Sequence, residues 1–92
     1  MMHTPIAELT RPTRVPGVSD AVIIASRNLP DEDGLYPSFV ALAKRDYPPF
    51  PSRAYSTHLV YFVDDGNVNE WLSASGHYEM SQESAYADYL RR

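Results

Sequence analysis

The sequence predicts an α+β fold, in which an antiparallel three- to four-stranded β-meander packs with two short helices in a single small domain. Asp65-Gly66 lies between two apolar runs rich in aromatic and β-branched residues, which is a strong hairpin signal. An amphipathic pattern follows Pro37, and a second one follows Ser81. At 92 residues the chain has the length of one domain.

The N-terminal region is expected to be an arm rather than part of the folded body. Pro12, Pro16 and Gly17 interrupt any regular element there. We therefore divide the chain into an extended Pro-rich arm, residues 1–17, and an α+β domain, residues 18–92. Residues 20–28 stay open between strand and short helix, because capping residues favour a helix while Val22 and the isoleucines favour a strand.

A first helix is predicted over residues 37–46. Its apolar residues recur at spacings of three and four, which describes one amphipathic face: Tyr36, Phe39, Val40, Ala43 and Tyr47. The segment Pro48-Pro49-Phe50-Pro51 ends this helix and contains a PxxP pattern. We favour a connecting loop whose Phe50 enters the core over a ligand for an aromatic groove.

The meander spans Thr57–Met80. With Asp65-Gly66 as a two-residue turn, Phe62 pairs with Asn69 and Val60 with Trp71, and Ala74-Ser75-Gly76 connects a second hairpin. One face then carries Leu59, Tyr61, Val63, Val68, Leu72, Tyr78 and Met80, and the other carries Val60, Phe62 and Trp71.

The last predicted helix begins after Ser81, which is a good N-cap. Tyr86, Tyr89 and Leu90 form the stripe that we expect to be buried. Two alternatives remain for Val60, Phe62 and Trp71: the C-terminal helix covers them, or a partner does.

Composition excludes several classes of function. The formal net charge of −4 and the pI near 5.1 argue against direct nucleic-acid binding. No apolar run approaches the length of a membrane span, and the N-terminus does not resemble a secretory signal. The absence of cysteine excludes disulfides and thiolate metal sites. We expect a cytoplasmic protein that does not contact a membrane.

The sequence contains no recognisable catalytic, cofactor-binding or metal-binding motif. His58 and His77 lie in strand contexts and could approach each other across the sheet as an acid-base or metal site. Histidines at the edge of a sheet with one end in water are the more ordinary interpretation. We therefore predict a protein that is not an enzyme and holds no cofactor or metal.

Acidic and aromatic residues are the candidates for binding a partner. The run Asp31-Glu32-Asp33 suggests a solvated loop that could meet Arg or Lys residues. Trp and Phe are frequent at the centre of interfaces. The predicted partner-binding residues are Asp31, Glu32, Asp33, Phe62, Asp64, Asp65, Glu70 and Trp71.

The C-terminal third resembles the small acidic anti-CRISPR proteins of phages over about 30 of the 92 residues. The residues that carry this resemblance are Tyr61, Asp64-Asp65, Val68, Ser75-Gly76, Tyr78 and Tyr86-Ala87-Asp88-Tyr89-Leu90. The resemblance implies a non-enzymatic inhibitor that binds a host CRISPR effector complex and blocks recognition of target DNA. A DNA mimic would carry more carboxylates than this chain, which has twelve acidic residues and eight basic ones.

The function expected from the sequence is that of a small acidic protein-interaction protein, such as a phage-encoded inhibitor, whose partner is a protein complex with a basic surface. The alternatives are a homodimeric structural or scaffold module and a small enzyme that uses His58 and His77.

Overall fold

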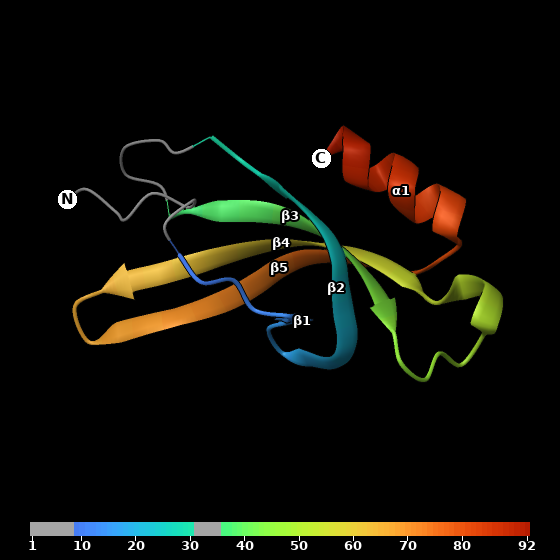
Figure 1. Ribbon diagram of the computed structural model, residues 1–92, viewed down its shortest axis with the longest axis horizontal. Coiled ribbons are helices and arrows are strands. Elements are labelled where there is room, and N and C mark those ends of the chain that lie inside the picture. The colour runs from blue at the N-terminus through green and yellow to red at the C-terminus, as the bar shows by residue number, and fades with distance from the viewer. Residues whose placement is uncertain (1–8, 31–35) are drawn as a thin grey trace.

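The computed structural model describes residues 9–30 and 36–92. Within these residues five antiparallel strands follow one another in the sheet in chain order, and a helix follows the last strand (Figure 1). The elements are β1 (Arg14–Val15), β2 (Val18–Asn28), β3 (Ser38–Arg45), the short 3₁₀ helix η2 (Pro51–Arg53), β4 (Tyr55–Asp65), β5 (Val68–Met80) and α1 (Gln82–Arg91).

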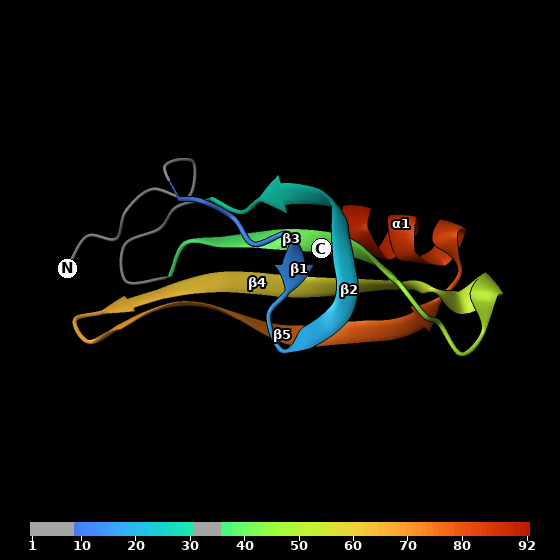
Figure 2. The ribbon, with the colours of Figure 1, turned by 60° about the horizontal axis from the view of Figure 1, so that its bottom comes forward.

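The predicted three- to four-stranded meander with two short helices is therefore wrong. The sheet of the described residues has five strands, and α1 is their single α-helix. Strand β2 arches across the other strands, so that the sheet curls into a nearly closed, barrel-like form (Figure 2). The protein is mostly antiparallel β-structure with α1 against one side.

The helix predicted over residues 37–46 is the strand β3 in the structure. Residues 39–43 are all buried, because β3 lies between β2 and β4 and is covered on both faces. A continuous apolar run also satisfies helical spacing, so the amphipathic pattern was ambiguous. Tyr47, which the helical pattern included, is 86% exposed beyond the end of β3.

Residues 20–28, left open between strand and helix, belong to the strand β2. The pairing of β2 with β3 is irregular between Ile23 and Ala25. An irregularity of this kind bends a strand and increases its twist. It lies where β2 must curve for the sheet to close.

The hairpin between β4 and β5 forms with a register that differs from the predicted one by two residues. Asp65 pairs with Val68, and Phe62 pairs with Trp71. Gly66 has a φ of +61° at the first central position of the turn, where glycine is favoured. The shift is even, so Val60, Phe62 and Trp71 still share a face, although Val60 pairs with Ser73.

The second hairpin predicted at residues 74–76 does not form. Strand β5 continues through these residues and pairs with β4 as far as Tyr55 and Met80. Two positive φ angles, 53° at Ser75 and 52° at Glu79, accompany the irregular pairing of this half of the strand. The residues that predicted a turn thus form bulges within one long strand.

The inner face of the curled sheet holds the larger part of the core. Phe39, Ala41 and Val60 are buried together, with Ile23 and Trp71 packed against them. Val15, Ala21 and Ala43 form a neighbouring cluster. Because Val15 is only 1% exposed, at least this part of the Pro-rich segment packs against the body.

Helix α1 covers the outer face at one end of the sheet. Val40 and Leu42 of β3 pack there with Ala85 and Tyr89. Ser81 caps the helix as predicted, since its side chain accepts a hydrogen bond from the backbone N–H of Ser84. The predicted buried stripe was partly wrong: Tyr89 is buried, whereas Tyr86 and Leu90 are more than half exposed.

Candidate functional site

The tip of the β4–β5 hairpin gathers three of the predicted partner-binding acids, Asp64, Asp65 and Glu70. Asp65 and Glu70 are exposed, and Asp64 is half-buried. Asp65 accepts a hydrogen bond from the hydroxyl of Tyr36, and this bond to a carboxylate raises the pKa of Tyr36 above its usual value. We refer to Asp64, Asp65 and Glu70 as the acidic tip.

The charges of the protein are distributed unevenly along the chain. Residues 54–90 contain six Asp or Glu residues and no Lys or Arg. Of the twelve acids in the sequence, four lie outside the described residues, which leaves eight. Three of these pair with arginines, and five do not: Asp64, Asp65, Glu70, Glu79 and Glu83.

The arginines are largely used within the protein. Arg14 pairs with Asp46 at 2.7 Å, and Arg45 pairs with Asp20 at 2.8 Å. Arg27 donates to the carbonyl of Tyr89. Aspartates thus partly neutralise the arginines in the N-terminal half of the chain. The acidic tip has no neutralising arginine or lysine among the described residues.

Phe62 and Trp71, also predicted to bind a partner, are half-buried and form an aromatic cluster with Phe39. The centre of the Trp71 ring lies 5.2 Å from that of Phe62 and 5.4 Å from that of Phe39. The indole N–H of Trp71 donates to the carbonyl of Thr10 at 2.9 Å. Trp71 thus bonds residues 9–16, which we call the N-terminal strap, whereas α1 packs against Val40 and Leu42 on the other face of the sheet.

The strap is fixed by side chains on both edges of the curled sheet. The hydroxyl of Ser73 donates to the carbonyl of Pro16 at 2.6 Å. The guanidinium of Arg11 lies 5.0 Å from the centre of the Phe39 ring and donates to Ser26 and Asn28. These contacts connect β5 to β1 and β2 where the strands themselves do not pair.

His58 and His77 do not converge on one site. His77 pairs with Thr57 across the two strands, and successive residues of a strand face opposite sides of the sheet. His58, which follows Thr57, therefore lies on the side opposite to His77. The His58 ring bonds the hydroxyl of Ser56 at 2.9 Å and packs edge-on against Tyr78. Burial, followed by the charges of Arg92 and His77, lowers the pKa of His58 to about 4.

His77 instead joins a polar cluster centred on the buried side chain of Asp88 in α1. Thr57 donates to the Oδ2 of Asp88 at 2.5 Å, and the Nδ1 of His77 lies 2.7 Å from the same oxygen. Arg91 and Arg92 approach this carboxylate to 3.5 Å and 3.4 Å. The bond from Thr57, supported by His77 and Arg92 against the opposing effect of burial, holds the pKa of Asp88 well below its usual range.

The geometry of this cluster favours a structural role. An Asp-His pair serves catalysis when the second ring nitrogen addresses a nucleophile. Here Thr57 bonds the carboxylate rather than the histidine. The cluster therefore anchors α1 to β4 and β5. Asp88 was not identified from the sequence, because its role depends on the packing of α1 against Thr57 and His77.

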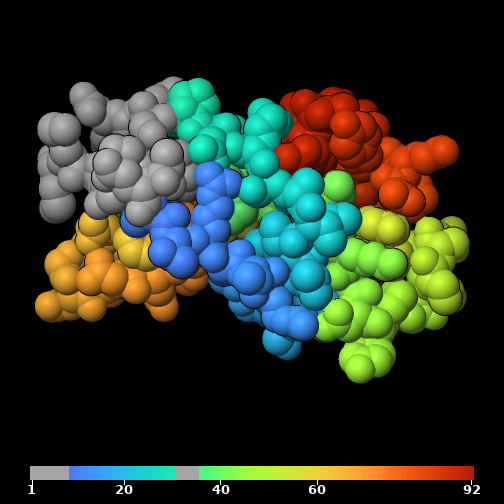
Figure 3. Space-filling model, in the orientation of Figure 1, coloured from blue at the N-terminus to red at the C-terminus, as the bar shows by residue number. Residues whose placement is uncertain are grey.

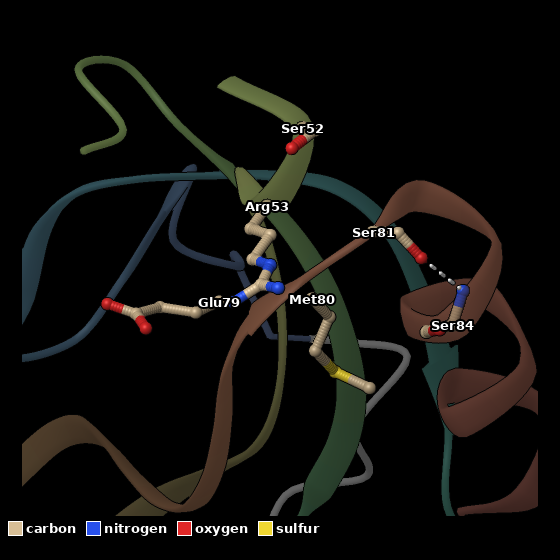
Figure 4. A pocket seen from close by; sticks show the side chains of 6 residues that line it. All are labelled: Ser52, Arg53, Glu79, Met80, Ser81 and Ser84. Carbon is tan, nitrogen blue, oxygen red and sulfur yellow. Dashed lines mark hydrogen bonds between the residues drawn. The ribbon is translucent and has the colours of Figure 1, made fainter. Parts of the chain in front are cut away.

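Among the described residues no three His, Cys, Asp or Glu side chains gather closely enough to hold a metal ion. A shallow hollow of about 450 Å³ lies at the start of α1, lined by Ser52, Arg53, Glu79, Met80, Ser81 and Ser84 (Figure 4). The guanidinium of Arg53 lies beside this hollow, the carboxylate of Glu79 points away from it, and the hydroxyl of Ser81 already caps the backbone N–H of Ser84 (Figure 4).

The remaining predicted positions fall as follows. Asp31, Glu32 and Asp33 lie outside the described residues. Phe50 does not enter the core, because 56% of its surface is exposed. The chain also bends at Pro49 and Phe50 and enters η2 at Pro51, so the PxxP segment is not a straight polyproline helix.

Comparison with protein-family models found no match. Searches of curated proteins and of solved structures also found none. Within residues 9–30 and 36–92, no helix is long and apolar enough to cross a membrane.

Proposed function

We propose that this protein is a small non-enzymatic binding protein whose acidic tip docks on a basic surface of another protein. The observation that carries the proposal is the charge of the β4–β5 hairpin. Asp64, Asp65 and Glu70 gather within a few residues of the turn, with no neutralising arginine or lysine among the described residues. Charges left unpaired at a tip steer association with a surface of opposite sign.

The position of the tip supports this role. The hairpin forms one end of the elongated molecule, away from α1 and η2 (Figures 1 and 2). Its base is fixed by the aromatic cluster of Phe39, Phe62 and Trp71. A supported hairpin presents its carboxylates in a defined arrangement, which lowers the entropy lost on binding.

The resemblance to phage anti-CRISPR proteins identifies the first partner to test. CRISPR effector complexes hold nucleic acid in positively charged channels. An acidic hairpin that occupies part of such a channel would block recognition of target DNA. Inhibition by contact with the complex requires no catalytic residue in this chain.

The experiment measures binding of the intact protein to a panel of purified CRISPR effector complexes, and the competition of target DNA for the same complexes. Asp64→Asn/Glu70→Gln removes two charges of the tip and keeps the Tyr36–Asp65 bond. The matched control Glu79→Gln removes an unpaired acid outside the tip. We expect the double variant to associate about tenfold more slowly at low salt, and the control to bind as the unchanged protein does.

Two results would contradict the proposal at different points. If none of the complexes binds the protein, the CRISPR partner is wrong. If a complex binds both variants equally well, the acidic tip is not the binding surface.

A further inference from the structure

An apolar hollow between β2 and α1 lies apart from the acidic tip. It has a volume of about 360 Å³ and is lined by Ile24, Leu42, Gln82, Glu83 and Tyr86. Ile24 is 51% exposed and Tyr86 54% exposed, although both are large apolar side chains. Strand β2 and α1 lie side by side at this place (Figure 3).

Leu90 extends this apolar surface along α1. It is 56% exposed and follows Tyr86 by four residues, so both lie on one flank of the helix. Tyr86 stacks on buried Tyr89, with 6.3 Å between ring centres, which helps to hold its ring beside the hollow. The same flank therefore has a hollow at its N-terminal half and an exposed side chain at its C-terminal half.

We propose that α1 pairs antiparallel with α1 of a second copy of this chain, across a two-fold axis near Ala87. An axis at residue 87 places Leu90 of one copy at the level of Ser84 in the other, between Gln82 and Tyr86 that line the hollow. Leu90 then fills the hollow of its partner, and the symmetry repeats the contact. Ala87 is small and exposed, so the two helices can approach closely at the axis.

The charges on α1 complement each other in the same arrangement. Glu83 in the first turn has no cationic partner among the described residues. Arg91 in the last turn is 73% exposed and makes a long contact of 3.5 Å with Asp88. The antiparallel pair brings Glu83 of each copy level with Arg91 of the other and opposes the two helix dipoles.

The proposed contact uses one flank of a helix of 10 residues, so we expect a weak dimer that forms with increasing concentration. Sedimentation equilibrium of the intact protein should show a mass that rises from 10.4 kDa towards twice that value. Leu90→Asp should weaken the association at least about tenfold, because it brings a charge into an apolar hollow. Tyr47→Ser, which changes an apolar residue exposed on the loop after β3, is the control and should leave it unchanged.

A charge exchange tests the orientation. Glu83→Arg alone and Arg91→Glu alone should each weaken the dimer, and the double variant should restore it. A monomeric mass up to about 1 mM would overturn the proposal, since even weak contacts assemble there. A dimer that is unaffected by Leu90→Asp would also overturn it, as would a double variant weaker than both single ones. Asp64→Asn/Glu70→Gln leaves this surface intact, so the test is independent of the proposed function.

Discussion

Trp71 of β5 donates its indole N–H to the carbonyl of Thr10, and this bond of 2.9 Å helps to close the curled sheet between strands that do not pair. Ser73, two residues further on, repeats the connection with the carbonyl of Pro16. The curled sheet is thus closed at this edge by side chains that bond the backbone of the N-terminal strap.

We predict that each of these two bonds contributes measurably to stability. Trp71→Phe keeps an aromatic ring but removes the donor, and Ser73→Ala removes the other donor. Each should lower the free energy of unfolding by about 1 kcal/mol in urea denaturation. Tyr47→Phe, in which an exposed hydroxyl is lost, should change it by less than about 0.5 kcal/mol. If Trp71→Phe and Ser73→Ala were as stable as Tyr47→Phe, these two bonds would contribute nothing measurable to the stability of the fold.

A second prediction concerns Asp88, whose carboxylate joins α1 to Thr57 and His77. Asp88→Asn should lower the free energy of unfolding at neutral pH by about 2–3 kcal/mol, because it weakens charge-assisted hydrogen bonds in a buried place. The native pKa of Asp88 is depressed, so its contribution is present above the usual value of 3.8 and decreases as the pH falls below it. The variant should lack that acid-dependent part of the stability profile.

His58 should produce a separate dependence on pH. Its pKa falls from 6.5 to about 4 in the folded protein, so between these values the unfolded chain binds the proton more readily. The contribution of His58 to the free energy of unfolding should be fully present above about pH 6.5. It should decrease by up to about 1.4 kcal/mol per pH unit as the pH falls towards 4. His58→Gln should flatten this part of the profile. An unchanged slope in the variant would assign the effect to another group.

Two glycine substitutions should differ in cost. Gly17 has a φ of +83°, and nothing lies within 4 Å of an added Cβ, so the cost of Gly17→Ala comes from the backbone alone. We expect a loss of about 1–2 kcal/mol. An added Cβ at Gly76 would meet the ring of Tyr78 at 2.7 Å, but this side chain is half exposed and can turn away. Thermal unfolding should therefore show the larger loss for Gly17→Ala.

Some parts of the fold could be predicted because neighbouring residues determine them. Ser81 caps α1 as expected, and the Asp65-Gly66 signal marks the β4–β5 hairpin to within two residues of register. Caps and tight turns depend on side chains a few positions apart. The acidic tip could be identified for the same reason, since its members lie close to one turn.

Other parts depended on contacts between distant segments. Residues 39–43 suit a helix or a buried strand equally well in their pattern, and β2 and β4 on either side of β3 decide for the strand. The turn signal of residues 74–76 was overridden by the pairing of β5 with β4 along its whole length. Asp88 became the centre of a cluster only because α1 packs against Thr57 and His77.

The sequence by itself determined the acidic charge of the second half of the chain, the hairpin that carries the acidic tip and the start of the last helix. Tertiary structure alone decided that Trp71 bonds the N-terminal strap, that His58 and His77 have different partners, and that Tyr86 and Leu90 stay exposed. The physical reason is that turns, caps and charge are properties of neighbouring residues. The covering of an apolar side chain depends instead on which distant segment packs against it in the folded protein.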